Sequence, residues 1–270
     1  RKVYAPPPYL FYRGCLQGDA LCLAVVGSRR STPYGRNVAR SFSEKLSKGG
    51  VTIVSGAAKG IDTAAHEGAL DAGAPTTAVL GCGVDVVYPA ENARLLEKIA
   101  AQGCIISEYP PGTQPTPGRF PARNRIVAGM STGVLVVEAA LKSGALITAD
   151  LALGENRDVY AIPGSVFSEA SRGTNRLIQQ GAMLINSPDE LLEEMGFAVP
   201  VQDQPANIIL SAKEYHILQI LDQEKALPVD SMVLQLGMEA SELLVILLQM
   251  EMAGYVVKDP SMGFRRSAKE

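Results

Sequence analysis

Tryptophan is absent from this 270-residue chain, and histidine occurs only twice, at His66 and His216. The four cysteines lie at no spacing typical of metal ligands, and two imidazoles are too few to complete a zinc site. They are Cys15, Cys22, Cys82 and Cys104. We therefore expect reduced thiols, no metal and no bound cofactor.

Long hydrophobic runs and a strong net charge are also absent. No apolar run approaches the roughly 20 residues that span a bilayer, and the first residues lack the pattern of a secretory signal. These absences predict a cytoplasmic protein without a membrane partner. The 25 basic and 28 acidic residues give a net charge of -3, which weighs slightly against nucleic-acid binding. Their placement is uneven, since 19 basic and 18 acidic residues precede Phe197, which leaves 6 and 10 after it.

Short apolar segments alternate with helical patterns through most of the chain. Continuous apolar runs of this length are typical of parallel strands whose two faces are both covered by helices. The sequence thus predicts an α/β fold with an extended, Rossmann-like, doubly wound and mostly parallel sheet. The expected strands are 21–26, 51–55, 76–80, 104–107, 134–137, 159–162 and 183–185.

The pattern divides the chain into four parts. Residues 1–20 form an amino-terminal lead with an expected edge strand at 10–13, and residues 21–196 form the Rossmann-like domain. Residues 197–207 carry two prolines and no periodicity, which is typical of a linker. From 208 to 270, three helices and a strand pair predict a small winged-helix-like domain, in which Ser211 and Glu214 form a capping box.

The turn after the first parallel strand is the most informative motif. The strand reaches Gly27 and Ser28 just before a helix, a place where free N–H groups and the helix dipole favour an anion. Arg29 and Arg30 add positive charge there. The turn lacks the G-x-G-x-x-G pattern, and no acidic residue closes the next strand, so classical NAD binding is not expected.

Small and basic residues recur where later strands end. Because the carboxyl ends of parallel strands meet at one edge of a sheet, we expect these residues to line one groove for a phosphate chain and a stacking base. Beyond the first turn, the predicted set is Ser55, Gly56, Arg119, Phe120, Arg123, Asn124, Arg125, Lys142, Ser143, Gly144 and Thr148.

Few residues suggest catalysis. Asp62 and His66 are four apart and so share a helix face. They fit an acid–base pair, but a hydrogen bond at the helix surface or between domains is the favoured interpretation. Glu138 ends a strand with no histidine or cysteine nearby in the sequence.

The motifs together carry a family resemblance. VVGSRRSTPYG, SGAAKGIDTAAHEGAL, GCGVDVVYPAEN, GRFPARNRIVAGMS, VVEAALKSGALITADLALGENRDVYAIPGS and RGTNRLIQQGA follow in this order, which closely resembles the DprA (Smf) family of DNA-processing proteins. The resemblance covers about residues 6–194. It implies a non-enzymatic protein that binds single-stranded DNA and loads the RecA recombinase during natural transformation.

The resemblance also implies particular residues. Arg29 and Lys142 match family positions that contact DNA phosphates. The last helix and strand of the domain pair two protomers in the family, which implies a homodimer through Leu177, Ile178, Met183 and Leu184. Lys59 stands where the family usually has Arg, and the helical domain that commonly precedes this fold in the family is not in this sequence.

Two other function classes stay open at this stage. Phosphoribohydrolases of related folds carry P-G-G-x-G-T-x-x-E, of which 130–138 keeps only Glu138. A winged-helix transcriptional regulator is the second alternative. The third helix of that domain, 239–251, has three acidic and no basic residues, which favours protein contact or regulation over DNA reading.

Overall fold

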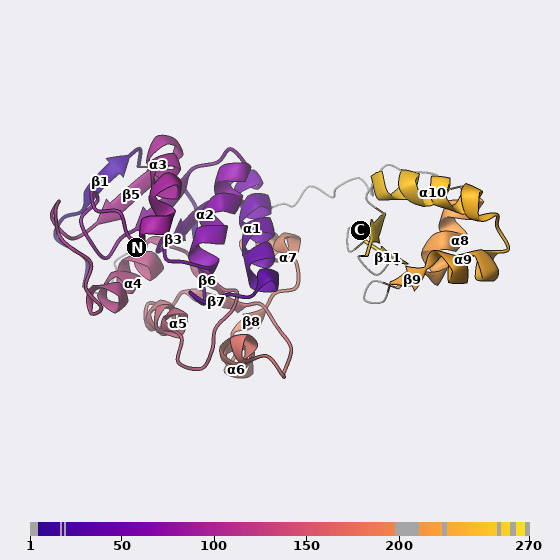
Figure 1. Ribbon diagram of the computed structural model, residues 1–270. Coiled ribbons are helices and arrows are strands. Elements are labelled where there is room, and N and C mark those ends of the chain that lie inside the picture. The colour runs from indigo at the N-terminus through magenta and orange to yellow at the C-terminus, as the bar shows by residue number, and fades with distance from the viewer. Residues whose placement is uncertain are drawn as a thin grey trace. The chain divides into compact units, whose positions relative to one another are not determined.

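The computed structural model (Figure 1) describes residues 5–16, 18, 20–197, 211–222, 226–252, 255–259 and 263–267. The chain divides into two compact units, Arg1–Pro200 and Val201–Glu270. Of the predicted linker, residues 198–207 lie outside the described residues. Phe197 belongs to the first unit, because its N–H donates to the carbonyl of Leu192 (2.9 Å) and its side chain packs against the core.

The first unit is built on an eight-stranded sheet of order β1-β5-β4-β3-β2-β6-β7-β8. Only β1 runs antiparallel, on the edge beside β5, and the other neighbours pair in parallel. This confirms the predicted mostly parallel sheet. The strands are β1 (Phe11–Gly14), β2 (Cys22–Val26), β3 (Thr52–Ser55), β4 (Thr76–Val79), β5 (Cys104–Ser107), β6 (Gly133–Val136), β7 (Asp158–Ala161) and β8 (Met183–Leu184).

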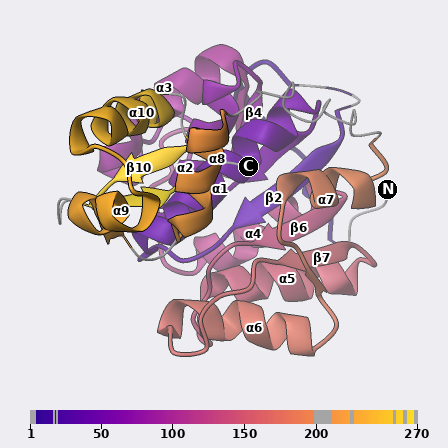
Figure 2. The ribbon, with the colours of Figure 1, turned by 90° about the vertical axis from the view of Figure 1, so that its right-hand side faces the viewer.

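Helices cover both faces of this sheet, because alternate strand residues point to opposite sides. In β2, Leu23 and Val25 pack with α1, α2 and α7, whereas Ala24 and Val26 pack with α4, α5 and α6. Figure 2 shows α5 and α6 next to each other below β7. The bounds are α1 (Pro33–Lys48), α2 (Ile61–Asp71), α3 (Ala93–Gln102), α4 (Arg119–Met130), α5 (Gly144–Gly154), α6 (Arg172–Gln179) and α7 (Pro188–Glu194).

Local sequence sets where the helices begin. Thr32 caps α1 by accepting the N–H of Gly35, and Pro33 fits the first helical position because its missing N–H has no intrahelical partner there. Ser143 caps α5 through the N–H of Ala145, and Ser187 caps α7 through that of Glu190. Two of these helix starts, those of α1 and α5, lie near the sheet edge that carries the site.

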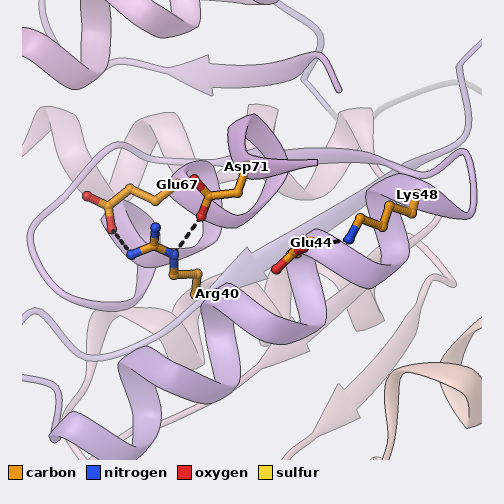
Figure 3. A network of polar contacts seen from close by, with 5 residues as sticks. All are labelled: Arg40, Glu44, Lys48, Glu67 and Asp71. Carbon is orange, nitrogen blue, oxygen red and sulfur yellow. Dashed lines mark hydrogen bonds and ion pairs between the residues drawn. The ribbon is translucent and has the colours of Figure 1, made fainter. Parts of the chain in front are cut away.

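Helices α1 and α2 pack closely on one face of the sheet. A Cβ at position 68 would overlap the carbonyl oxygen of Arg40, so the approach requires Gly68. Figure 3 shows the Arg40 guanidinium between Asp71 (2.6 Å) and Glu67 (3.9 Å), which are both on α2. Because these pairs are half exposed, they contribute little beyond the packing.

The second unit has the three helices and strand pair that the sequence predicts. Its helices α8 (Ala212–Ile220), α9 (Val229–Leu236) and α10 (Ala240–Met252) enclose a separate apolar core, and β10 (Val256–Lys258), β11 (Gly263–Arg266) and β9 (Leu227–Pro228) form a sheet of order β10-β11-β9. The predicted capping box of Ser211 and Glu214 is present. Among the described residues, no single helix is long and apolar enough to cross a membrane; α9 and α10 reach that length only together, with a bend of 111°.

Candidate nucleic-acid interface

A cavity of about 620 Å³ opens at the carboxyl ends of β2, β3, β6 and β7. It lies where the chain, having added β3, β4 and β5 on one side of β2, adds β6 on the other side. Ligands of open α/β sheets bind at such a reversal of strand order, because two adjacent loops part there. The fold therefore places the candidate site where the sequence analysis expects it.

The structure brings most of the predicted residues together around this cavity. They come from the turn after β2, the loop after β3, the first half of α4 and the start of α5. The predicted residues that line it are Gly27, Ser28, Arg29, Arg30, Gly56, Phe120, Arg123, Asn124, Lys142, Ser143, Gly144 and Thr148. A Cβ at Gly27 would overlap Ile61 and the carbonyl oxygen of Glu138, so the turn after β2 requires glycine.

Three exposed cations face the cavity. Arg29, Arg30 and Lys142 line it, and within the described part of the chain none of them forms an ion pair with an acidic side chain. The carboxylate of Glu169, which also lines the cavity, is paired with Arg172 (2.8 Å). The mouth of the cavity thus carries positive charge that no internal partner neutralises.

An aromatic stack borders the cavity on the α4 side. The rings of Phe120 and Tyr88 are stacked with centroids 5.3 Å apart, and the Arg29 guanidinium lies 5.0 Å from the Phe120 centroid on a cation–π contact. A second, smaller cavity of about 90 Å³ adjoins this stack and shares Arg29, Phe120 and Arg123 with the first. A planar, cation-holding surface of this kind suits a nucleobase.

The floor of the cavity holds a buried pair of opposite charges. Arg123 and Asp62 are both buried, and Arg123 donates to the carbonyl of Val79. Burial raises the pKa of Asp62 against the opposing charge of Arg123, and burial lowers the pKa of Arg123. Because Arg123 is buried and donates to the carbonyl of Val79, it shapes the floor and is not exposed at the mouth.

Three predicted residues do not line the cavity, and these expectations were wrong. Ser55 is fully buried and donates its hydroxyl to the carbonyl of Val25 (2.6 Å). Arg125 does not line the cavity and forms a largely buried ion pair with Glu108. Arg119 donates to the carbonyl of Gln114 and lies over the ring of Tyr109. Arg125 lies two residues after Arg123 and so faces another side of α4. Arg119, four residues before Arg123, shares its helix face and is held instead by Gln114 and Tyr109.

The N-terminus of α1 is also not the anion site that the sequence predicts. The N–H of Ser28 donates to the carbonyl of Glu138 (2.7 Å) and so is not free. The Glu138 carboxylate accepts hydrogen bonds from the N–H (2.9 Å) and the hydroxyl (2.5 Å) of Thr32. The negative charge that the α1 dipole favours is therefore the protein's own. The helix start that opens onto the cavity belongs to α5, beside Lys142.

The interpretation of Asp62 and His66 as a helix-surface or interdomain pair was wrong, because both are buried within the first unit. Nδ1 of His66 lies 2.8 Å from the hydroxyl oxygen of Thr76, which itself donates to the carbonyl of Ile53 (2.7 Å). Nδ1 therefore holds the proton. Burial, followed by the charge of Arg123, lowers the pKa of His66 to about 3, so the imidazole is neutral.

The predicted dimer residues separate into two groups. Leu177 is buried in its own domain and Ile178 is partly buried against the same cluster, so Leu177 is corrected from interface to core. Met183 and Leu184 are 42% and 36% exposed on β8, which is the edge strand of the sheet.

Sequence reasoning missed several parts of the site. Tyr88, in the loop after β4, is not among the predicted site residues. Its position as an aromatic residue before proline in a loop of small residues could have indicated it. Glu169 and Ala170, which follow β7, also line the cavity, and no sequence pattern indicated them. Among the described residues, no group of three or more His, Cys, Asp or Glu side chains is placed to hold a metal ion.

Comparison with known proteins agrees with this geometry. Residues 1–196 match the family model of DNA recombination-mediator protein A, and residues 200–262 match that of the DprA winged helix domain. The chain belongs to the DNA recombination-mediator protein A family. Protein Smf of Escherichia coli is 40% identical over 263 residues, which are 94% of this chain and 70% of that protein.

Other relatives match about three quarters of the chain. Protein Smf of Synechocystis is 48% identical over 208 residues, 75% of this chain but only 52% of that protein, so the chain spans about half of this relative. The structure of DprA from Streptococcus pneumoniae superposes with a TM-score of 0.68 at 45% identity, covering 73% of this chain and 69% of that one. DprA of Helicobacter pylori, whose structure is described for its single-stranded DNA binding mode, gives 0.65 at 34% identity, covering 70% and 87%.

Proposed function

We propose that this chain binds single-stranded DNA in the cavity at the carboxyl ends of β2, β3, β6 and β7. The observation that carries the proposal is the set of three unpaired cations, Arg29, Arg30 and Lys142, beside the stacked rings of Phe120 and Tyr88. Phosphates and bases need these two kinds of surface together. The Helicobacter relative, with its described single-stranded DNA binding mode, supports the same ligand.

The proposed mechanism is electrostatic capture followed by stacking. Arg29 and Arg30 hold phosphates from the turn after β2, and Lys142 holds one at the start of α5, where the helix dipole adds a favourable field. Small residues, among them Gly56 and Gly144, admit the backbone and bases. An unpaired base then stacks at Phe120. Bases of a duplex already stack on each other, so we expect single strands to bind more tightly.

A hydrolytic role is not part of the proposal. Glu138 is the one acidic residue that this chain shares with the phosphoribohydrolase motif. It is buried, and its carboxylate accepts hydrogen bonds from Thr32. His66 is neutral, fully buried and held by Thr76. Neither side chain lines the cavity, so Glu138 and His66 do not reach a substrate held there.

Transcriptional regulation through the winged helix is also disfavoured. The outward side of α10 carries Leu244, Val245 and Leu248, which are 48%, 57% and 57% exposed, and the helix has no Lys or Arg. An apolar and acidic surface does not hold DNA phosphates. A protein contact suits this helix better than duplex reading.

The family supports two further parts of the proposal. As a recombination mediator, the protein would pass its bound strand to the RecA recombinase during natural transformation, a role that it would carry out in the cytoplasm. It would act as a homodimer through β8, where an edge strand exposes both Met183 and Leu184. Unpaired edge strands are ready to pair with another copy.

One binding experiment separates the three function classes. The protein is incubated with a labelled single strand, the same sequence as a duplex, and AMP. Tight binding of the single strand, weaker binding of the duplex and no release of adenine from AMP are expected. Adenine release would establish the hydrolase instead, and a duplex preference would establish the regulator.

A further inference from the structure

The turn after β7 carries the most exposed aromatic side chain among the described residues. Phe167 is 95% exposed, and its neighbour Val166 is 74% exposed. The turn itself is well formed: the N–H of Phe167 donates to the hydroxyl oxygen of Ser165 (3.3 Å), and the N–H of Ser168 donates to the carbonyl of Ser165 (3.0 Å). A defined backbone thus holds a bare phenyl ring in solvent.

This turn leads directly into the wall of the candidate site. Glu169 and Ala170, which line the cavity, follow Phe167 by two and three residues. Two residues of extended chain span at most roughly 7 Å, so the Cα of Phe167 lies within that distance of a residue that lines the cavity. The position is anchored, since the carbonyl of Ala170 accepts the N–H of Ala139 (2.8 Å), from the loop that also carries Lys142.

Phe120 lines the cavity, and Phe167 lies in the segment that leads into Glu169 and Ala170, which also line it. Phe120 packs against Tyr88 and the loop after β4, whereas Phe167 follows β7. Between these two strands the sheet runs β4-β3-β2-β6-β7, and Arg29, Arg30 and Lys142 follow β2 and β6 in the middle. In the order of the sheet, the loops that carry the cations therefore have an aromatic residue on the β4 side and another in the segment after β7.

The chemistry of this turn favours a nucleobase over other occupants. An exposed phenyl ring lacks the favourable free energy of burying its apolar surface. Stacking on a base would bury one face of the ring, and it would do so for any base sequence. Gly164, Ser165 and Ser168 leave room around it. Glu169, the nearest acidic side chain along the chain, is paired with Arg172 and so repels a phosphate less.

We propose that Phe167 is a second base-stacking platform, on which a nucleotide stacks as the strand leaves the cavity past β7. This inference rests on the proposed binding of single-stranded DNA. It adds a direction for the strand, across the sheet edge from Phe120 to Phe167, and a longer binding site than the cavity alone.

The absence of tryptophan makes a direct test available. Phe167→Trp places the only tryptophan of the chain in this turn. Titration with an unlabelled thymidine strand is followed by tryptophan emission, and binding of the same strand, labelled, is followed by anisotropy. Quenching that saturates together with the anisotropy is expected. Anisotropy without quenching would overturn the platform and leave the proposed function standing, whereas no anisotropy change would overturn both.

A paired substitution measures the contribution of the ring. Phe167→Ala should weaken binding of strands of about 16 nucleotides by roughly five- to 150-fold and have no effect on strands of about 4. Val166→Ala, on the same turn, is the matched control and should bind like the parent. Equal affinity of Phe167→Ala and the parent for the longer strands would overturn the proposal. So would a change in sedimentation with unchanged affinity, which would place a second copy on the ring.

Discussion

Arg29 and Lys142 are the side chains through which the proposed contacts with phosphate are most directly tested. Arg29→Ala and Lys142→Ala should each weaken single-strand affinity by about 1.5 to 3 kcal/mol, because each removes a charge-assisted contact. Both side chains are exposed, so thermal stability should change little. Lys48→Ala, which removes an exposed cation paired with Glu44 on α1, is the control and should bind like the parent. Two variants with parental affinity would contradict the assignment.

His66 gives the fold a pH dependence whose sign is fixed. Its pKa is lowered to about 3 in the folded protein, by burial first and by Arg123 second, and an unfolded histidine titrates near about 6.5. The unfolded chain therefore binds more protons between these values. Stability from this group is complete above about pH 6.5 and falls toward pH 3, by up to about 1.4 kcal/mol per pH unit.

Urea unfolding across that pH range measures this effect. His66→Gln, which keeps a donor for Thr76 without a titrating ring, should show a smaller loss of unfolding free energy on acidification than the parent. Identical pH profiles for the two proteins would show that other groups dominate acid unfolding.

At the scale of elements, the sequence predicted the strands well but wrongly predicted a free anion site at the N-terminus of α1. Apolar runs such as 51–55 mark strands because a doubly covered sheet leaves no exposed face. The sequence pattern could not predict that Glu138 binds the N-terminus of α1, since Thr32 and Glu138 are 106 residues apart. Local patterns predicted turns that favour phosphate, and only the tertiary contact showed that Glu138 already occupies the N-terminus of α1.

Residue positions on α4 show the same limit. Arg119, Arg123 and Arg125 are equivalent as basic residues in the sequence, and the helix turns them to different neighbours. In β2, successive residues face opposite sides of the sheet, so the sequence alone predicts which residues share a side. No comparable pattern in the sequence distinguishes a buried arginine such as Arg123 from an exposed one such as Arg29.

The prediction for dimer formation concerns β8, an edge strand of the sheet. Leu184→Glu should give a folded monomer in sedimentation velocity, because a charge on an exposed edge residue opposes pairing with another copy and leaves the core intact. Leu153→Glu, at an exposed position of α5, is the control and should remain dimeric. A dimer in both variants would move the interface away from β8.

At the scale of the whole molecule, the two units have separate cores and different charge. The 19 basic residues before Phe197 include all that line the cavity, whereas the remainder is net -4, from 6 basic and 10 acidic residues. A phosphate surface built on that remainder would suffer like-charge repulsion. The carboxyl-terminal unit is therefore expected to contribute little to strand binding.

Removal of residues 198–270 tests this expectation. The truncation ends after Phe197 because that side chain packs on the core of the first unit. Anisotropy with a labelled single strand should show an affinity within about tenfold of the full chain, or roughly 1.4 kcal/mol. A larger loss, with the truncated protein still folded by circular dichroism, would show that the winged helix takes part in binding.

The salt dependence of single-strand affinity tests the proposed function most directly. Three unpaired cations at the cavity predict that the logarithm of the association constant falls with the logarithm of salt concentration at a slope of about -2, since each neutralised phosphate contributes roughly -0.7 for a single strand. Lys142→Ala should reduce the steepness by about 0.7. At every salt concentration the single strand should bind more tightly than the duplex. A slope near zero, or a preference for the duplex, would contradict electrostatic capture of single strands in this cavity.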